Sequence, residues 1–162
     1  MIILGIDPGT TTIGFSLIKK EKSKIKLIDY GIFKTTPKIE LKYKIFEIGN
    51  DINEIIKKYN PDILSIEKLF FQTNTKTAID VAQARGVIIY ECIKNGLKIQ
   101  EYTPLQVKKA ITGNGKANKL QLQNAIKILF GLESIPKPDD AADAIGLAYI
   151  GALNSNQINN GF

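Results

Sequence analysis

The sequence predicts an α/β fold, in which a mixed sheet of five strands carries helices on both of its faces. Five short apolar runs bounded by turn residues have the length and composition of strands. After the third run they alternate with longer segments in which apolar residues recur every three or four positions, as on one face of a helix. Strands that alternate with helices are typical of parallel pairing, whereas the first three runs are close enough together to pair as antiparallel neighbours.

Each predicted strand has its own signal. The first run is buried in character and ends at the turn Asp7-Pro8-Gly9-Thr10. The second and third runs flank a polar turn over residues 21–24, which predicts a hairpin. The predicted strands cover residues 2–6, 12–20, 25–35, 62–66 and 97–102.

The predicted helices are marked by their spacing and by their ends. Apolar residues alternate at intervals of four and three from Leu41 to Tyr59, and this helix has to stop before Pro61. Asn95-Gly96 is typical of a helix end, and Thr103-Pro104 is typical of a helix start. The predicted helices cover residues 41–59, 75–94, 104–111, 119–130 and 140–153.

This order of elements matches the ribonuclease-H-like fold. At 162 residues the chain fits one domain with a buried core. We expect a single domain of this fold over residues 1–153, followed by a polar, frayed tail over residues 154–162.

The composition favours a polyanionic partner. The 22 Lys and Arg residues exceed the 16 Asp and Glu residues, which gives a formal charge of +6. The chain has no histidine, and this excludes Ser-His, Cys-His and His-metal chemistry. No apolar run approaches the roughly 20 residues that span a bilayer, and the single cysteine, Cys92, cannot form an internal disulfide. We therefore expect a cytoplasmic protein with no membrane partner.

Four acidic residues are predicted to meet at one edge of the sheet. Asp7 and Glu67 each follow an apolar strand, and the carboxyl ends of neighbouring parallel strands lie together. Asp140 and Asp143 lie on one face of a helix because they are three positions apart. Four carboxylates would repel one another unless a hard cation neutralised them, and Mg²⁺ prefers carboxylate oxygens. The pattern therefore predicts a two-metal site for phosphodiester chemistry.

Four motifs, in their order and spacing, resemble those of the RuvC family of Holliday-junction resolvases, and the likeness stops only at the C-terminal tail. The motifs are Gly5-Ile6-Asp7-Pro8-Gly9-Thr10, Ile66-Glu67-Lys68-Leu69-Phe70, Gln83-Ala84-Arg85-Gly86 and Asp140-Ala141-Ala142-Asp143-Ala144. The resemblance implies a homodimeric, Mg²⁺-dependent endonuclease that cuts four-way junction DNA with paired symmetric nicks. It also implies that the cleavage products carry 5′-phosphate and 3′-hydroxyl ends. The enzyme would act together with a branch-migration motor complex in recombination and DNA repair.

Carried over by position, the resemblance makes Asp7, Glu67, Asp140 and Asp143 the catalytic, metal-binding acids. It implies two Mg²⁺ per active site, with Mn²⁺ as a substitute. Asp139 leaves an alternative open, because its spacing from Asp143 would let it replace or supplement Asp140 on the same helix face. We assign Asp139 to the N-cap and Asp140 to the first helical position.

Candidate DNA contacts lie in a basic segment and after the fourth strand. Residues 108–119 contain four lysines and no acid, so they either form a solvated face or bind backbone phosphates. We assign Lys108, Lys116 and Lys119 to DNA binding, and the first and last of these occupy the family's basic positions near the catalytic acids. Phe70 occupies the family's position for an aromatic that contacts junction bases, with burial in the core as the alternative.

The candidate dimer interface is the helix predicted over residues 75–94. Small residues at Ala78, Ala82 and Gly86 would allow a close approach, and a glycine within a helix costs about 1 kcal/mol relative to alanine. The alternative is packing against the chain's own sheet, whereas the family uses this helix for its two-fold dimer.

Two other functions are left open by the sequence. The first is a catalytically silent DNA-structure-binding protein on the same fold. The second is a small ATP-binding, kinase-like domain, because the Gly-x-Asp-x-Gly-Thr motif is similar to a phosphate loop of the sugar-kinase, actin and Hsp70 superfamily. Those proteins close two such domains around the nucleotide, and this chain has the length of one.

Overall fold

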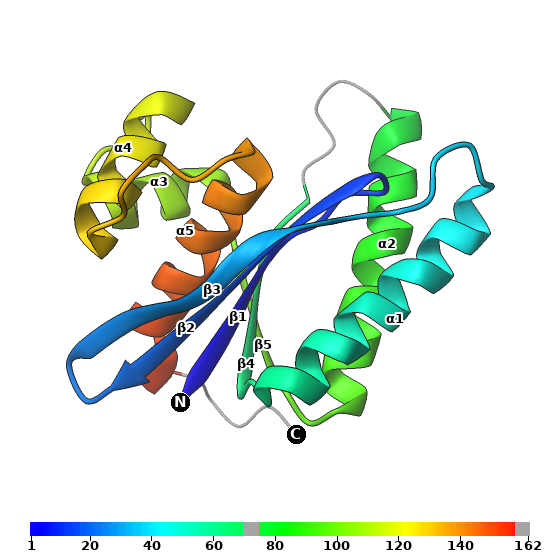
Figure 1. The fold of residues 1–162 in the computed structure, drawn as a ribbon, viewed down its shortest axis with the longest axis horizontal. Coiled ribbons are helices and arrows are strands. Elements are labelled where there is room, and N and C mark those ends of the chain that lie inside the picture. Colours follow the sequence, from blue (N-terminus) through cyan, green and yellow to red (C-terminus); the bar gives the residue numbers. More distant parts are fainter. Residues whose placement is uncertain (70–74, 158–162) are drawn as a thin grey trace.

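The sheet has the strand order β3-β2-β1-β4-β5 in the computed structural model, which describes residues 1–69 and 75–157 (Figure 1). The strands are β1 (Ile2–Asp7), β2 (Thr12–Glu21), β3 (Lys24–Lys34), β4 (Ile63–Glu67) and β5 (Lys98–Tyr102). β1 pairs antiparallel with β2 and parallel with β4, which places a parallel half beside an antiparallel half. The predicted mixed sheet is confirmed, and each strand end lies within one residue of the prediction.

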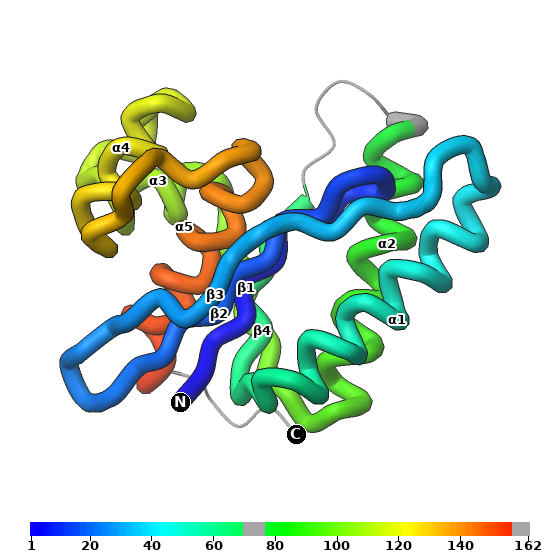
Figure 2. The backbone as a smooth tube through the Cα atoms, in the orientation of Figure 1, coloured from blue at the N-terminus to red at the C-terminus, as the bar shows by residue number. Residues whose placement is uncertain are grey.

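Helices cover both faces of this sheet. On one face lie α1 (Leu41–Tyr59) and α2 (Thr75–Lys94), and on the other lies α5 (Asp139–Leu153). The backbone trace shows α3 (Pro104–Thr112) and α4 (Lys119–Phe130) on the same side as α5 (Figure 2). Within the described residues, no helix is long and apolar enough to cross a membrane.

The alternation of side chains along β1 explains the two layers. Leu4 and Ile6 pack into the core beneath α1 and α2, whereas Ile3 packs with Ala148 of α5. Successive side chains of a strand point to opposite faces of the sheet. Because helices cover both faces at β1, this strand needs apolar residues on both sides, which explains its unbroken apolar run.

The helix ends follow local signals in the sequence. Thr103 and Gln106 form a reciprocal capping box at the start of α3, with Pro104 as the first helical residue. After α2, Gly96 adopts a φ of 84°, which closes the helix as the Asn95-Gly96 pair predicts. These ends fix where the chain returns to the sheet.

Two expectations about the C-terminal region were wrong. Pro138, not Asp139, is the N-cap of α5, so Asp139 is the first helical residue and Asp140 the second. The tail is not frayed over residues 155–157, which form the 3₁₀ helix η1 (Ser155–Gln157). Lys20 of β2 anchors it by donating to the Ser155 hydroxyl at 2.9 Å, and Ser155 is buried. The expectation for residues 158–162 lies outside the described part of the chain.

The N-terminal half of α5 packs directly onto the backbone of the sheet. A Cβ added to Gly14 would collide with the backbone carbonyl of Asp140, and one added to Gly5 would collide with that of Ala144. Glycine at these two positions therefore lets the helix axis approach β1 and β2 closely.

Two buried serines of the sheet fix the rotation of α5. The Ser16 hydroxyl donates to the carbonyl oxygen of Ala144 at 2.7 Å, and the Ser65 hydroxyl donates to that of Leu147. Because both hydroxyls are fully buried, these bonds satisfy groups that would otherwise be costly to desolvate. The first turn of α5 is thereby placed beside the end of β1.

Candidate active site

Four acidic side chains meet where β1, β4 and α5 come together. Ile6 pairs with Ile66 in the parallel register, so Asp7 and Glu67 stand side by side at the strand ends. Asp140 and Asp143 come from the start of α5, and the charges of all three other acids act on Asp7. The structure thus brings together the four acids that the sequence predicted to meet.

The Asp7 carboxyl is the most strongly perturbed of the four. Burial, followed by the negative charges of Asp143, Glu67 and Asp140, raises its pKa from 3.8 to about 8. Burial is also the main cause that raises the pKa of Glu67 and that of Asp143. The ionised cluster is therefore unfavourable unless positive charge is supplied.

Two lysines supply part of that charge. Lys108 of α3 lowers the pKa of Glu67 and of Asp143, and Lys119 of α4 lowers that of Asp7 and of Asp143. Lys119 is the more exposed of the two and can reach solvent. Of the three predicted DNA-binding lysines, these two stand beside the acids.

A cleft of about 220 Å³ opens between the acids and the lysines. Its polar wall combines Glu67 and Asp143 with Lys108 and Lys119. Its apolar wall comes from α3, α4 and α5, and consists of Pro104, Val107, Leu122 and Leu147. Lys116 is exposed and does not line this cleft, and Phe70 lies outside the described residues.

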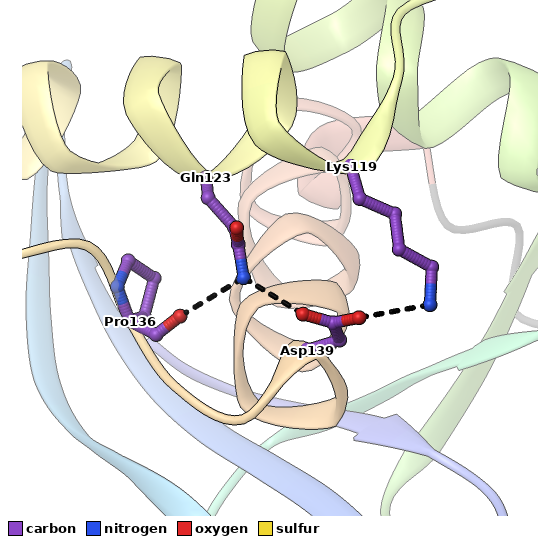
Figure 3. Close-up of polar contacts among 4 residues, drawn as sticks. All are labelled: Lys119, Gln123, Pro136 and Asp139. Atoms are coloured by element: carbon purple, nitrogen blue, oxygen red, sulfur yellow. Dashed lines mark hydrogen bonds and ion pairs between the residues drawn. The ribbon is translucent and has the colours of Figure 1, made fainter.

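Asp139 is bound to α4 (Figure 3). Its carboxylate accepts hydrogen bonds from Lys119 Nζ at 2.9 Å and from Gln123 Nε2 at 2.9 Å. Gln123 also donates to the carbonyl oxygen of Pro136 at 3.3 Å, which ties the start of α5 to α4. Asp140 acts on Asp7, and both Asp139 and Asp140 act on Asp143, so the hydrogen bonds of Asp139 to α4 are what distinguish the two.

Comparison with known proteins gives the family. Residues 3–150 match the family model described as "Crossover junction endodeoxyribonuclease RuvC". The chain belongs to this family. The RuvC of Caldicellulosiruptor saccharolyticus is 47% identical over 98% of this chain and 96% of that protein. The RuvC of Halothermothrix orenii is 51% identical over 91% of this chain and 90% of that protein.

A solved structure agrees in fold over nearly the whole chain. The structure titled "T. thermophilus RuvC in complex with Holliday junction substrate" has a TM-score of 0.86 and 26% identity, and covers 97% of this chain and 96% of that one. The ribonuclease-H-like fold class, the RuvC resemblance and the endonuclease class predicted from the sequence are confirmed.

Membership of the RuvC family implies a requirement for a divalent metal ion, and the donor set fits one. The four acids offer only carboxylate oxygens, which hard divalent cations prefer. Within residues 1–69 and 75–157, no three acidic, histidine or cysteine side chains converge closely enough to chelate an ion. Repulsion between ionised carboxylates opposes their closer approach, and a bound cation would remove that repulsion.

Three positioning contacts were not predicted from the sequence. Ser16 and Ser65 hold α5, and Gln123 holds Asp139, yet none was singled out as functional. A signal was present in each case. A serine inside an apolar strand, or a glutamine on the buried face of α4, has to find a hydrogen-bond partner.

We expect the free energy of unfolding in metal-free buffer to decrease as the pH rises from about 4 to about 8. Asp7 has a folded-state pKa above its ordinary value of 3.8, so between these pH values the native state binds more protons than the unfolded chain. Each pKa unit corresponds to about 1.36 kcal/mol, which makes the Asp7 contribution at most about 6 kcal/mol. Urea unfolding at several pH values measures this slope.

The Asp7→Asn variant is the control for this experiment. It removes the titrating group, so its unfolding free energy should depend less on pH and should exceed the wild-type value near pH 8. An equal pH slope in the two proteins would show that Asp7 does not carry the effect.

Proposed function

We propose that the protein is a homodimeric, Mg²⁺-dependent endonuclease that resolves Holliday junctions by paired, symmetric nicks. The observation that carries the proposal is the cleft in which acids from β4 and α5 face lysines from α3 and α4, beside Asp7 of β1. Family membership and the junction complex of the Thermus thermophilus relative support the choice of substrate.

The residues of the cleft divide the chemistry between them. Asp7, Glu67, Asp140 and Asp143 would hold two Mg²⁺, and Mn²⁺ suits the same oxygen ligands. The bound metals would activate a water for in-line attack and stabilise the departing 3′ oxygen, which gives 5′-phosphate and 3′-hydroxyl ends. Lys108 and Lys119 would bind oxygens of the DNA backbone next to the scissile phosphate.

The cellular setting is part of the same proposal. We assign the protein to the cytoplasm, with the branch-migration motor complex as a partner. Burial raises the pKa of the Cys92 thiol to about 12, so this cysteine is unreactive and suits a reducing compartment.

The direct test is incubation with a synthetic four-way junction and Mg²⁺, with a duplex of matched sequence as the control. Paired nicks at symmetric positions of the junction, with the duplex intact, are the expected result. Junction binding without nicks would indicate a silent DNA-structure-binding protein. ATP binding in place of junction binding would indicate the kinase-like alternative.

Removing one acid charge should separate cleavage from binding. We expect Asp7→Asn and Asp140→Asn to lower the cleavage rate by orders of magnitude. Junction affinity should persist or increase, because fewer negative charges repel the phosphates. Asp139→Asn should retain most of the rate, since Asp139 is bound to α4. Single-turnover cleavage and gel-shift titration measure both quantities, and a wild-type rate in Asp7→Asn would contradict the metal site.

The lysines can be tested through the salt dependence of binding. Lys108→Ala and Lys119→Ala should each reduce the slope of log K against log salt by about 0.9, the value for one lost phosphate contact. Lys19→Ala is the control, because Lys19 is exposed and pairs with Ile2 at the opposite end of the sheet. If neither cleft variant changes the slope, the two lysines form a solvated face.

The dimer follows from the substrate and from the outer face of α2. Two nicks related by two-fold symmetry require two sites, and each 17.9 kDa chain supplies one. Ile79, Tyr90 and Ile93 are 54%, 61% and 49% exposed, and they lie on one stripe of α2 with Gly86, where a Cβ would meet no atom. Ala78 and Ala82 flank this stripe and are half-buried.

We expect Ala82→Arg to give a folded monomer that has lost paired cleavage, because a charged, bulky side chain blocks the close approach of two helices. Sedimentation equilibrium measures the mass. Ile128→Arg is the control, since Ile128 is 80% exposed on α4 in the opposite layer, and this variant should remain dimeric. A monomeric wild type at micromolar concentration, with or without junction DNA, would overturn the dimeric mechanism.

A further inference from the structure

Arg85 is the only arginine among the 22 Lys and Arg residues of the chain, and it connects α2 to the ends of two strands. Its Nε donates to the backbone carbonyl oxygen of Glu67 at 2.9 Å, and its Nη2 forms an ion pair with Glu101 of β5. The side chain is largely buried, with 16% of its surface exposed. It belongs to the Gln83-Ala84-Arg85-Gly86 motif, in which Gly86 is a candidate dimer residue and Arg85 has no assigned role.

The Glu67 carbonyl needs a donor that the sheet cannot supply. The Lys68 N–H donates to the Tyr102 carbonyl of β5. The Glu67 carbonyl belongs to the same peptide group and points the opposite way, toward β1. In the register that pairs Ile6 with Ile66, the N–H that would reach this carbonyl belongs to residue 8. Residue 8 is a proline and has no N–H. Arg85 supplies the missing hydrogen bond from α2.

An arginine is suited to this place because two acceptors lie in fixed directions. The guanidinium is a planar fork that can serve the Glu67 carbonyl and the Glu101 carboxylate together, whereas a lysine ammonium is a single point of charge on a flexible stem. Every other basic residue of the chain is a lysine. The single arginine thus stands where the geometry of the donor matters.

We propose that Arg85 is a positioning residue for Glu67, and this inference rests on the proposed function. By fixing the backbone at the end of β4, Arg85 holds the Glu67 carboxylate at the cleft against repulsion from Asp7 and Asp143. The Arg85 guanidinium contacts the backbone carbonyl oxygen of Glu67, so it acts on this residue through the main chain. Because it lies on α2, it also joins the acid site to the helix proposed to meet the partner subunit.

The test is the metal dependence of Arg85→Gln, with Arg85→Lys as the conservative variant. We expect Arg85→Gln to raise the half-saturating Mg²⁺ concentration for junction nicking by about tenfold or more, as for other groups that orient a metal ligand. Most of the rate should return at saturating Mg²⁺. Arg85→Lys should lie between this variant and wild type, because it keeps the charge and loses the fork.

A second measurement does not depend on activity. The rise in melting temperature caused by Mg²⁺ alone, without DNA, should be smaller in Arg85→Gln than in wild type at the same metal concentration. Lys19→Gln is the matched control, since it removes one positive charge from an ion pair at the opposite end of the sheet, and it should behave as wild type. If Arg85→Gln does not fold, Glu101→Gln serves instead, because it removes the carboxylate that anchors the guanidinium. In Glu101→Gln, too, the Mg²⁺-induced rise in melting temperature should be smaller than in wild type.

The outcomes distinguish this inference from the proposed function. An Arg85→Gln protein with a lower rate at every Mg²⁺ concentration and an unchanged half-saturation point would have lost general stability only, and the inference would be overturned. If wild type does not nick the junction, the proposed function fails. The Mg²⁺-induced shift in melting temperature still decides whether Arg85 positions the acid site, and an equal shift in wild type and Arg85→Gln overturns it.

Discussion

The close approach of α5 to the sheet is the constraint on which the site depends. Gly14 lies opposite Asp7 in the β1–β2 pairing, and it is also the residue whose missing side chain admits the Asp140 backbone. A larger residue there would push the start of α5 outward, because interiors are packed too densely to absorb a methyl group without movement. Asp140 and Asp143 would then move away from the ends of β1 and β4. The buried bonds from Ser16 and Ser65 fix the same helix in rotation, so its two acids face the strand ends.

This packing holds together charges that repel one another. The raised pKa of Asp7 shows that the fold keeps a carboxylate where its ionised form is unfavourable, and Lys108 and Lys119 relieve only part of the repulsion. Stability given up at one place in a fold is typical of functional sites. The remaining demand for positive charge is what a divalent cation would meet. Lys108 and Lys119 share the polar wall of the cleft with the acids, and they would suit a phosphate bound beside that cation.

The sequence predicted those features whose causes are local and missed those whose causes are distant. Strand and helix ends followed from neighbouring residues, such as Thr103-Pro104 at the start of α3. The predicted N-cap role of Asp139 failed because its carboxylate binds Lys119 and Gln123, which precede it by 20 and 16 positions. The tail was expected to fray because no local signal reveals that Lys20 of β2 would hold Ser155. The four acids were predicted to meet because the carboxyl ends of parallel strands share one edge, a rule that needs only the strand order.

Two prolines end the hydrogen-bond ladder on both sides of β4, just after Glu67. Beyond Glu67, the next donors in register on the two neighbouring strands would be residue 8 after β1 and residue 104 after β5, and both are prolines without an N–H. The ladder on each side of β4 therefore stops just after the acid, and the chain is free to leave the sheet there. Pro104 serves at the same time as the first residue of α3, the helix that brings Lys108 to the cleft. The ends of the two strands thus leave the acid at the edge of the sheet and direct a lysine toward it, while Arg85 holds the end of β4 in place.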